Sequence, residues 1–116
     1  MRIEVRGRNV EITDELRGHV IKRFRRVGKQ VSELATLDVE ISEERNPSIR
    51  DSQVADATLR LKGVTLRAKE ASPEMAHTIH HLAEDIRRQV KKHRELRRKR
   101  SQTRRAVARL RGQSAA

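Results

Sequence analysis

The stretch that decides the fold is ADATLRLKGVTLRAK, residues 55–69. Apolar and polar residues alternate on both sides of Lys62-Gly63, which is typical of two half-buried strands joined by a tight turn. One face of this hairpin is apolar, and the other face is polar or charged. The apolar face must be covered by other elements, while the polar face can remain in water.

The segments before and after the hairpin supply two more strands and two helices. Residues 2–6 alternate as a strand that ends at Gly7, and Leu37, Val39 and Ile41 mark another strand before a loop over residues 43–52. Thr13 is a suitable N-cap for a helix that we expect to end at Gly28. The apolar stripe of this helix is Leu16, Val20, Phe24 and Val27.

A second helix is predicted from Ser72-Pro73-Glu74, with Ser72 as N-cap and Pro73 at the first helical position. Its apolar face consists of Met75, Ile79, Leu82, Ile86 and Val90. Because this spacing supports packing only to about Val90, we expect the rest of the helix to project from the body. Repulsion between its many bases should fray that end, and phosphate binding should order it.

The predicted order is therefore β-α-β-β-β-α. Each strand has a single apolar face, so the fold class is α+β, with one four-stranded sheet and two helices packed on one face. This build is similar to that of a double-stranded-RNA-binding domain. We divide the chain into a domain over residues 1–100 and a basic flexible tail over residues 101–116.

The net charge of the chain is concentrated at its C-terminal end. The whole sequence has a formal net charge of +12, and the segment from Ile86 onward holds thirteen Lys or Arg residues against one acid, Glu95. Residues 1–85 carry equal numbers of bases and acids. A neutral body with a cationic end is suited to binding a polyanion.

Nucleic acid is a better candidate for this polyanion than an anionic membrane surface. A membrane-surface helix needs large apolar side chains opposite its basic face, but the only aromatic residue, Phe24, lies outside the basic segment. No apolar run is long enough to span a bilayer, no export signal is evident, and the chain has no Cys, so we expect a cytoplasmic protein. Because Phe24 is its only Phe, Tyr or Trp, the chain has no platform on which bases could stack, and it should recognise folded RNA by shape and backbone.

Several separated segments are similar to the bacterial ribosome hibernation promoting factors and the related ribosome-associated inhibitor, protein Y. The similarity covers about residues 2–100, and it is carried by Gly7-Arg8-Asn9-Val10-Glu11-Ile12-Thr13, by Asp56-Ala57-Thr58-Leu59 and by Arg88-Gln89-Val90-Lys91-Lys92-His93-Arg94. The family has the same β-α-β-β-β-α fold. The resemblance implies a stress or stationary-phase factor that binds the small ribosomal subunit, occupies the messenger and transfer RNA channel of the 70S ribosome and inhibits translation.

The resemblance also implies which side chains contact 16S ribosomal RNA. Basic positions of the family match Arg23 and Arg26 on the first helix and Arg88, Lys92 and Arg94 on the second. With the neighbouring bases, the predicted contacts are Arg23, Arg26, Arg88, Lys91, Lys92, Arg94, Arg97 and Arg98. Ala76 and Asp85 depart from the Tyr and Lys that the family often has at those positions. The chain ends before the second domain of long-form members, so it is either a short form or the N-terminal domain of a long form.

The alternative to a ribosome hibernation factor is a general module that binds structured or double-stranded RNA. An enzyme is not expected, because no nucleophile-base motif or phosphate loop occurs, and we expect no cofactor and no small-molecule substrate. His77 and His81, four residues apart, have a spacing that can hold zinc, but they lack thiolate partners, and His80 is expected to pair locally with Glu84.

Overall fold

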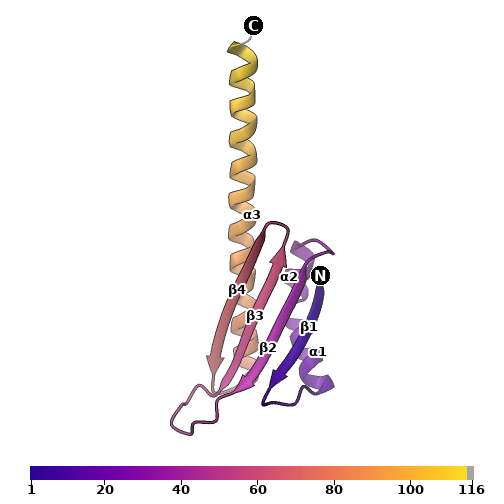
Figure 1. Ribbon diagram of the computed structural model, residues 1–116, viewed down its shortest axis with the longest axis vertical. Coiled ribbons are helices and arrows are strands. Elements are labelled where there is room, and N and C mark those ends of the chain that lie inside the picture. Colours follow the sequence, from indigo (N-terminus) through magenta and orange to yellow (C-terminus); the bar gives the residue numbers. More distant parts are fainter. Residues whose placement is uncertain (115–116) are drawn as a thin grey trace.

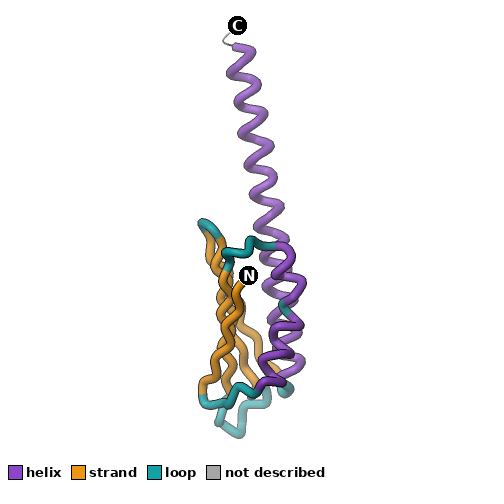
Figure 2. The backbone as a smooth tube through the Cα atoms, turned by 90° about the vertical axis from the view of Figure 1, so that its right-hand side faces the viewer, coloured by secondary structure: helices purple, strands orange, loops and turns teal. Residues whose placement is uncertain are grey.

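The computed structural model describes residues 1–114 and forms two layers, a four-stranded sheet and a layer of helices (Figures 1 and 2). Its elements are β1 (Arg2–Arg8), α1 (Asp14–Arg23), α2 (Arg25–Gln30), β2 (Thr36–Glu43), β3 (Gln53–Leu61), β4 (Val64–Ser72) and α3 (Met75–Ser114). The strands lie in the order β1-β2-β3-β4, with β1 parallel to β2 and the other pairs antiparallel. The predicted α+β class and its one-sided helical cover are confirmed; the likeness to a double-stranded-RNA-binding domain stays a prediction.

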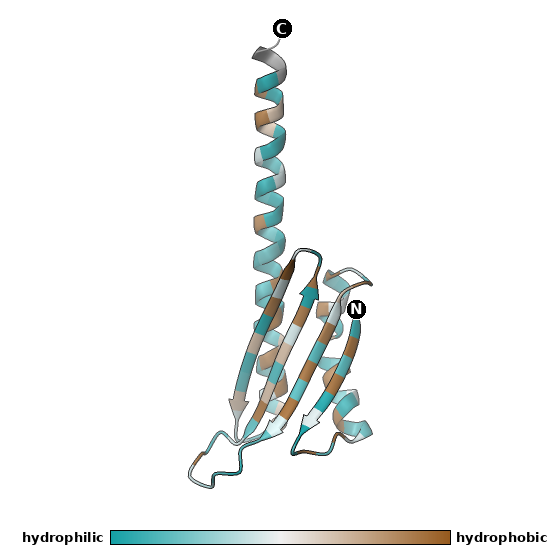
Figure 3. Ribbon diagram, viewed as in Figure 1, coloured by the Kyte–Doolittle hydropathy of each residue, from teal (hydrophilic) through white to brown (hydrophobic). Residues whose placement is uncertain are grey.

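Alternation along the strands places one apolar face against the helices. Leu37, Val39 and Ile41 of β2 and Ala55, Ala57 and Leu59 of β3 are buried, while their sequence neighbours are more exposed. Figure 3 shows the same alternation as brown and teal bands along the strands, and it shows that the upper part of α3 is mostly hydrophilic. Helix residues complete the core: Val20, Phe24, Val27, Ile79, Leu82, Ile86 and Val90.

The first helix differs from its prediction. It is interrupted at Phe24, whose backbone lies between the helical and extended regions (φ −89°, ψ 3°), and it resumes as α2. The predicted end at Gly28 is wrong, because α2 continues to Gln30. The predicted apolar stripe stays buried across the interruption: Val20, Phe24 and Val27 are all at most 1% exposed.

The start of the long helix is also later than predicted. Ser72 is the last residue of β4, and the carbonyl of Glu74 accepts the first helical hydrogen bond from the Thr78 amide at 3.1 Å. Ser72 still supports the helix start, since its Oγ accepts a hydrogen bond from the Glu74 amide at 3.3 Å. The buried Thr78 hydroxyl donates to the Gln53 carbonyl at 2.8 Å, which fixes α3 against the start of β3.

Two turns at opposite ends of the sheet depend on particular residues. Gly63 has φ +80°, a conformation that favours glycine, and it forms the predicted turn between β3 and β4. β1 continues past the predicted end at Gly7, to Arg8. The next residue, Asn9 (φ 55°), exchanges two 3.0 Å hydrogen bonds between its side-chain amide and the backbone of Glu43 in β2. This exchange continues the pairing of β1 and β2 by one step.

The segment predicted as a basic flexible tail is helical over its described part. α3 runs without interruption to Ser114, and residues 115–116 of the predicted tail lie outside the described residues. The division of the chain at residue 100 stays a prediction.

Candidate nucleic-acid interface

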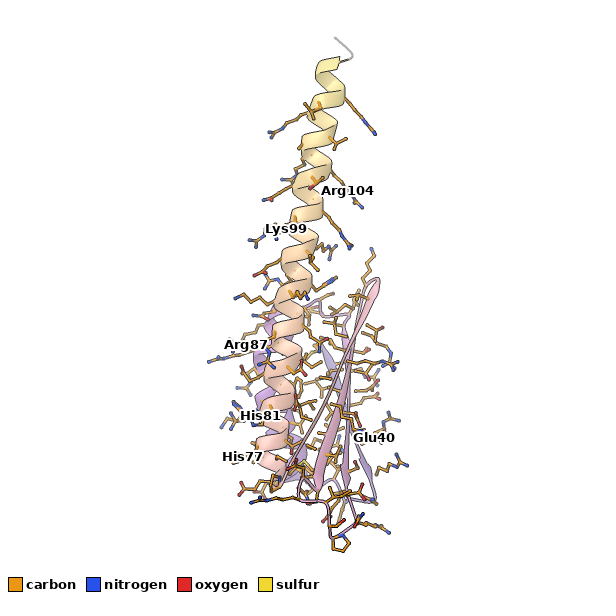
Figure 4. All side chains as sticks on the ribbon, turned by 90° about the vertical axis from the view of Figure 1, so that its left-hand side faces the viewer. Glu40, His77, His81, Arg87, Lys99 and Arg104 are labelled. Carbon is orange, nitrogen blue, oxygen red and sulfur yellow. The ribbon has the colours of Figure 1, made fainter. Side chains whose placement is uncertain are left out.

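The candidate interface is centred on the basic arm, which we define as the part of α3 from Arg87 to Arg111. Up to Val90 one side of α3 is buried against the body, and beyond His93 every residue to Arg111 is exposed. Figure 4 shows that the side chains of the arm extend from all sides of the helix, among them the labelled Lys99 and Arg104. The arm therefore offers cationic groups in every direction around one helix.

The sequence of α3 explains where packing ends. Ile79, Leu82, Ile86 and Val90 recur at three and four residues and are at most 1% exposed. After them, the large apolar residues of the helix, such as Leu96 and Leu110, are exposed. Beyond His93 no residue of the arm to Arg111 is buried, so this part projects from the body, and its helical form rests on the packed turns up to Val90.

All eight predicted RNA contacts are exposed, but they lie on different faces: Arg23, Arg26, Arg88, Lys91, Lys92, Arg94, Arg97 and Arg98. Arg88 lies two residues from both Ile86 and Val90, which are buried, so it faces away from the sheet. Arg94 and Arg97 lie on the side of α3 that faces the end of the sheet, where they line a groove. Arg23 ends α1 and Arg26 belongs to α2, in the same helical layer as α3.

Within residues 1–114, few ion pairs neutralise the bases of the helical layer, so its charge stays mostly positive. Arg87 lies 3.6 Å from Glu84, one turn earlier on α3. On the open face of the sheet, Arg60 is bonded to Asp38 of the neighbouring strand. That face carries acids, such as Glu40 and Asp56, as well as bases, such as Arg67, so it lacks the one-sided charge of the arm.

Sequence reasoning missed two bases that the fold places beside the arm. Arg60 and Lys62, at the end of the β3–β4 hairpin, line the same groove as Arg94 and Arg97. The Lys62-Gly63 turn could be recognised from the sequence. Its position next to α3 could not, because it depends on how the hairpin packs across the helix.

The histidines at the start of α3 take part in local contacts. His77 lies 3.7 Å from Glu74, and the rings of His80 and His81 meet edge to face with centroids 5.6 Å apart. Glu84, the expected partner of His80, instead pairs with Arg87. Over residues 1–114, no group of three potential ligands is arranged to hold a metal ion, and no helix is long and apolar enough to cross a membrane.

Comparison with known proteins identifies a family whose model matches most of the chain. The model of the family described as "Sigma 54 modulation protein / S30EA ribosomal protein" matches residues 3–98. A ribosome hibernation promoting factor of Acinetobacter guillouiae is 27% identical over 101 residues, which cover 83% of this chain and 89% of that protein. A ribosome hibernation promotion factor of Picosynechococcus is 28% identical over 96 residues, and there the match covers 82% of this chain but only 50% of the relative.

A solved structure has the same fold as this chain. The N-terminal domain of Thermus thermophilus protein Y superposes with a TM-score of 0.67 and 26% identity, over 79% of this chain and 98% of that domain. The sequence match spans β1 to the first turns of the basic arm, so it includes both the body and part of the candidate interface. The chain therefore belongs to the Sigma 54 modulation protein / S30EA ribosomal protein family.

Proposed function

We propose that this protein is a ribosome hibernation factor, which binds the small ribosomal subunit in the channel for messenger and transfer RNA and blocks translation by occupying it. The observation that carries the proposal is the charge of the molecule: an almost neutral α+β body bears one projecting helix with nearly all the excess positive charge. The names of the relatives support ribosome hibernation as the process. A cytoplasmic location follows from this function.

The mechanism requires no chemical step. Long-range attraction by the basic arm speeds the encounter with ribosomal RNA and supplies most of the affinity through phosphate contacts. The body then decides which site is occupied, because A-form RNA is recognised by its shape and backbone more than by its base edges. Inhibition results from occupancy, since messenger and transfer RNA cannot enter a filled channel.

The test is co-sedimentation with purified 70S ribosomes at about 150 mM salt, a concentration at which weak surface attraction is largely screened. We expect saturable binding of about one copy per ribosome, lost when messenger and transfer RNA fill the decoding sites. Binding in many copies, or binding that ignores site occupancy, would instead favour a general module for structured RNA.

A further inference from the structure

A groove of about 610 Å³ lies where α3 leaves the body. Three segments form it: the connection from α2 to β2, the tip of the β3–β4 hairpin, and α3 from Val90 to Arg97. Figure 1 shows these segments gathered at the upper end of the sheet, below the projecting part of α3. The groove is in the size range of small-ligand sites, about 300–1,000 Å³.

The lining of the groove combines an aliphatic floor with a cationic rim. Val31, Ala35, Leu61 and Val90 supply the apolar surface. The rim bears no carboxylate; its cationic or titratable members are Arg60, Lys62, His93, Arg94 and Arg97. Arg60 is bonded to Asp38, so Lys62, Arg94 and Arg97 are the bases best placed to meet an anion.

We propose that this groove receives one unpaired nucleotide of a structured RNA, an inference that rests on the proposed RNA-binding function. The base lies on the aliphatic floor, while Lys62, Arg94 and Arg97 bind the phosphates on either side of it. Gln30, an exposed residue at the end of α2, also lines the groove, and its amide can hydrogen-bond to a base edge.

Charge and exposure favour RNA as the occupant. Arg94 and Arg97 belong to the basic arm, so an RNA strand following the arm passes the mouth of the groove. Leu34 is 91% exposed on the α2–β2 connection that lines the groove, and it offers apolar surface to the ribose or base of a bound nucleotide. RNA-binding proteins usually shelter an unstacked base on aromatic side chains. In this chain the aliphatic floor of the groove can take that role.

The experiment compares two RNA hairpins that differ only in one extruded nucleotide, using the full chain. Binding is followed by the NMR shifts of the Val31, Leu34 and Leu61 methyl groups and by titration of labelled RNA. We expect the bulged hairpin to bind about tenfold more tightly than the fully paired one and to shift these methyl groups. Lys62→Glu should remove about tenfold of the affinity for the bulged hairpin, the scale of one lost charge-assisted hydrogen bond.

Lys69→Glu is the matched control, because Lys69 is an exposed lysine of the same hairpin that does not line this groove. Equal binding of the two hairpins, or equal losses with Lys62→Glu and Lys69→Glu, would overturn the proposal. So would an acidic peptide that shifts the same methyl groups as strongly as the bulged RNA. Ribosome co-sedimentation separates the two ideas: if it persists with Lys62→Glu while the hairpins bind equally, the proposed function stands and the groove does not.

Discussion

At the scale of single residues, Phe24 is the largest fully buried side chain of the first helical segment. It is fully buried at the junction of α1 and α2, where its amide donates to Val20 and its carbonyl accepts from Gly28. Phe24→Ala removes the only aromatic side chain and leaves a cavity, which should lower the free energy of unfolding by about 3–5 kcal/mol. Urea denaturation followed by circular dichroism measures this loss.

Leu34→Ala is the control for that substitution. It also truncates a large apolar side chain, but Leu34 is 91% exposed, so its effect should stay within about 0.5 kcal/mol. If the two variants unfolded at the same urea concentration, the side chain of Phe24 would not be packed as the structure has it.

Individual core residues were largely predictable, and backbone irregularities were not. The period of Leu16, Val20, Phe24 and Val27 identified the inward side of the first helical segment, because burial follows from spacing along a helix. The interruption at Phe24 has no such signal, since neither Gly nor Pro stands there. The interruption coincides with the place where α1 and α2 both pack against α3, a long-range contact that local sequence does not contain.

At the scale of elements, the outer face of α3 carries two of the proposed ribosome contacts, Arg88 and Lys92. Arg88 and Lys92 are exposed, one turn apart, and belong to that face. Replacing both with Glu should leave the unfolding transition unchanged and weaken ribosome binding by about a hundredfold, the scale of two lost charge-assisted contacts. Co-sedimentation and circular dichroism on the same preparation measure both quantities.

The matched control is Arg45→Glu with Arg50→Glu, which makes the same change in net charge on the exposed β2–β3 loop. That loop lies at the end of the sheet opposite to the arm (Figure 1). Equal weakening by the two double variants would mean that only net charge matters and that the outer face of α3 has no special role.

Element types could be predicted from the sequence, and their ends only in part. Alternation in β2, β3 and β4 and the spacing of Ile79, Leu82 and Ile86 are direct consequences of packing on one side. α3 starts later than its capping signal predicts, because Ser72 pairs with Gln53 in the sheet and thereby remains in β4. Strand pairing of this kind is a long-range contact, which a local capping signal does not contain.

At the scale of the whole molecule, the arm dominates the shape. The radius of gyration is 19.0 Å and the extents are 72 × 28 × 17 Å, whereas a compact domain of this length has a radius of about 13 Å. The concentration of charge in this arm was evident from sequence. The groove at its base was not, since it joins residues from three distant parts of the chain.

The length of the arm leads to a prediction about salt. If about six phosphates are neutralised, the logarithm of the ribosome binding constant should fall with the logarithm of salt concentration with a slope near −5. Deleting residues 101–116 removes Arg104, Arg105, Arg109 and Arg111 without touching a buried residue of the described chain. We expect unchanged folding. If at least three of these four bases contact phosphates beside the contacts predicted up to Arg98, the slope should become shallower by at least about 2, because each lost phosphate contact contributes about 0.7–0.9.

Comparing the salt slopes of the full chain and the deletion variant also shows which part of the arm contacts ribosomal phosphates. A deletion variant with the same slope as the full chain would show that residues 101–116 make no phosphate contacts, and the bases from Arg87 to Arg100 would then account for the binding. A shallower slope with retained competition by transfer RNA would show that the tail adds affinity while the body alone selects the site. Measurement at four salt concentrations between about 50 and 200 mM separates these outcomes, because the expected affinities then differ by more than tenfold.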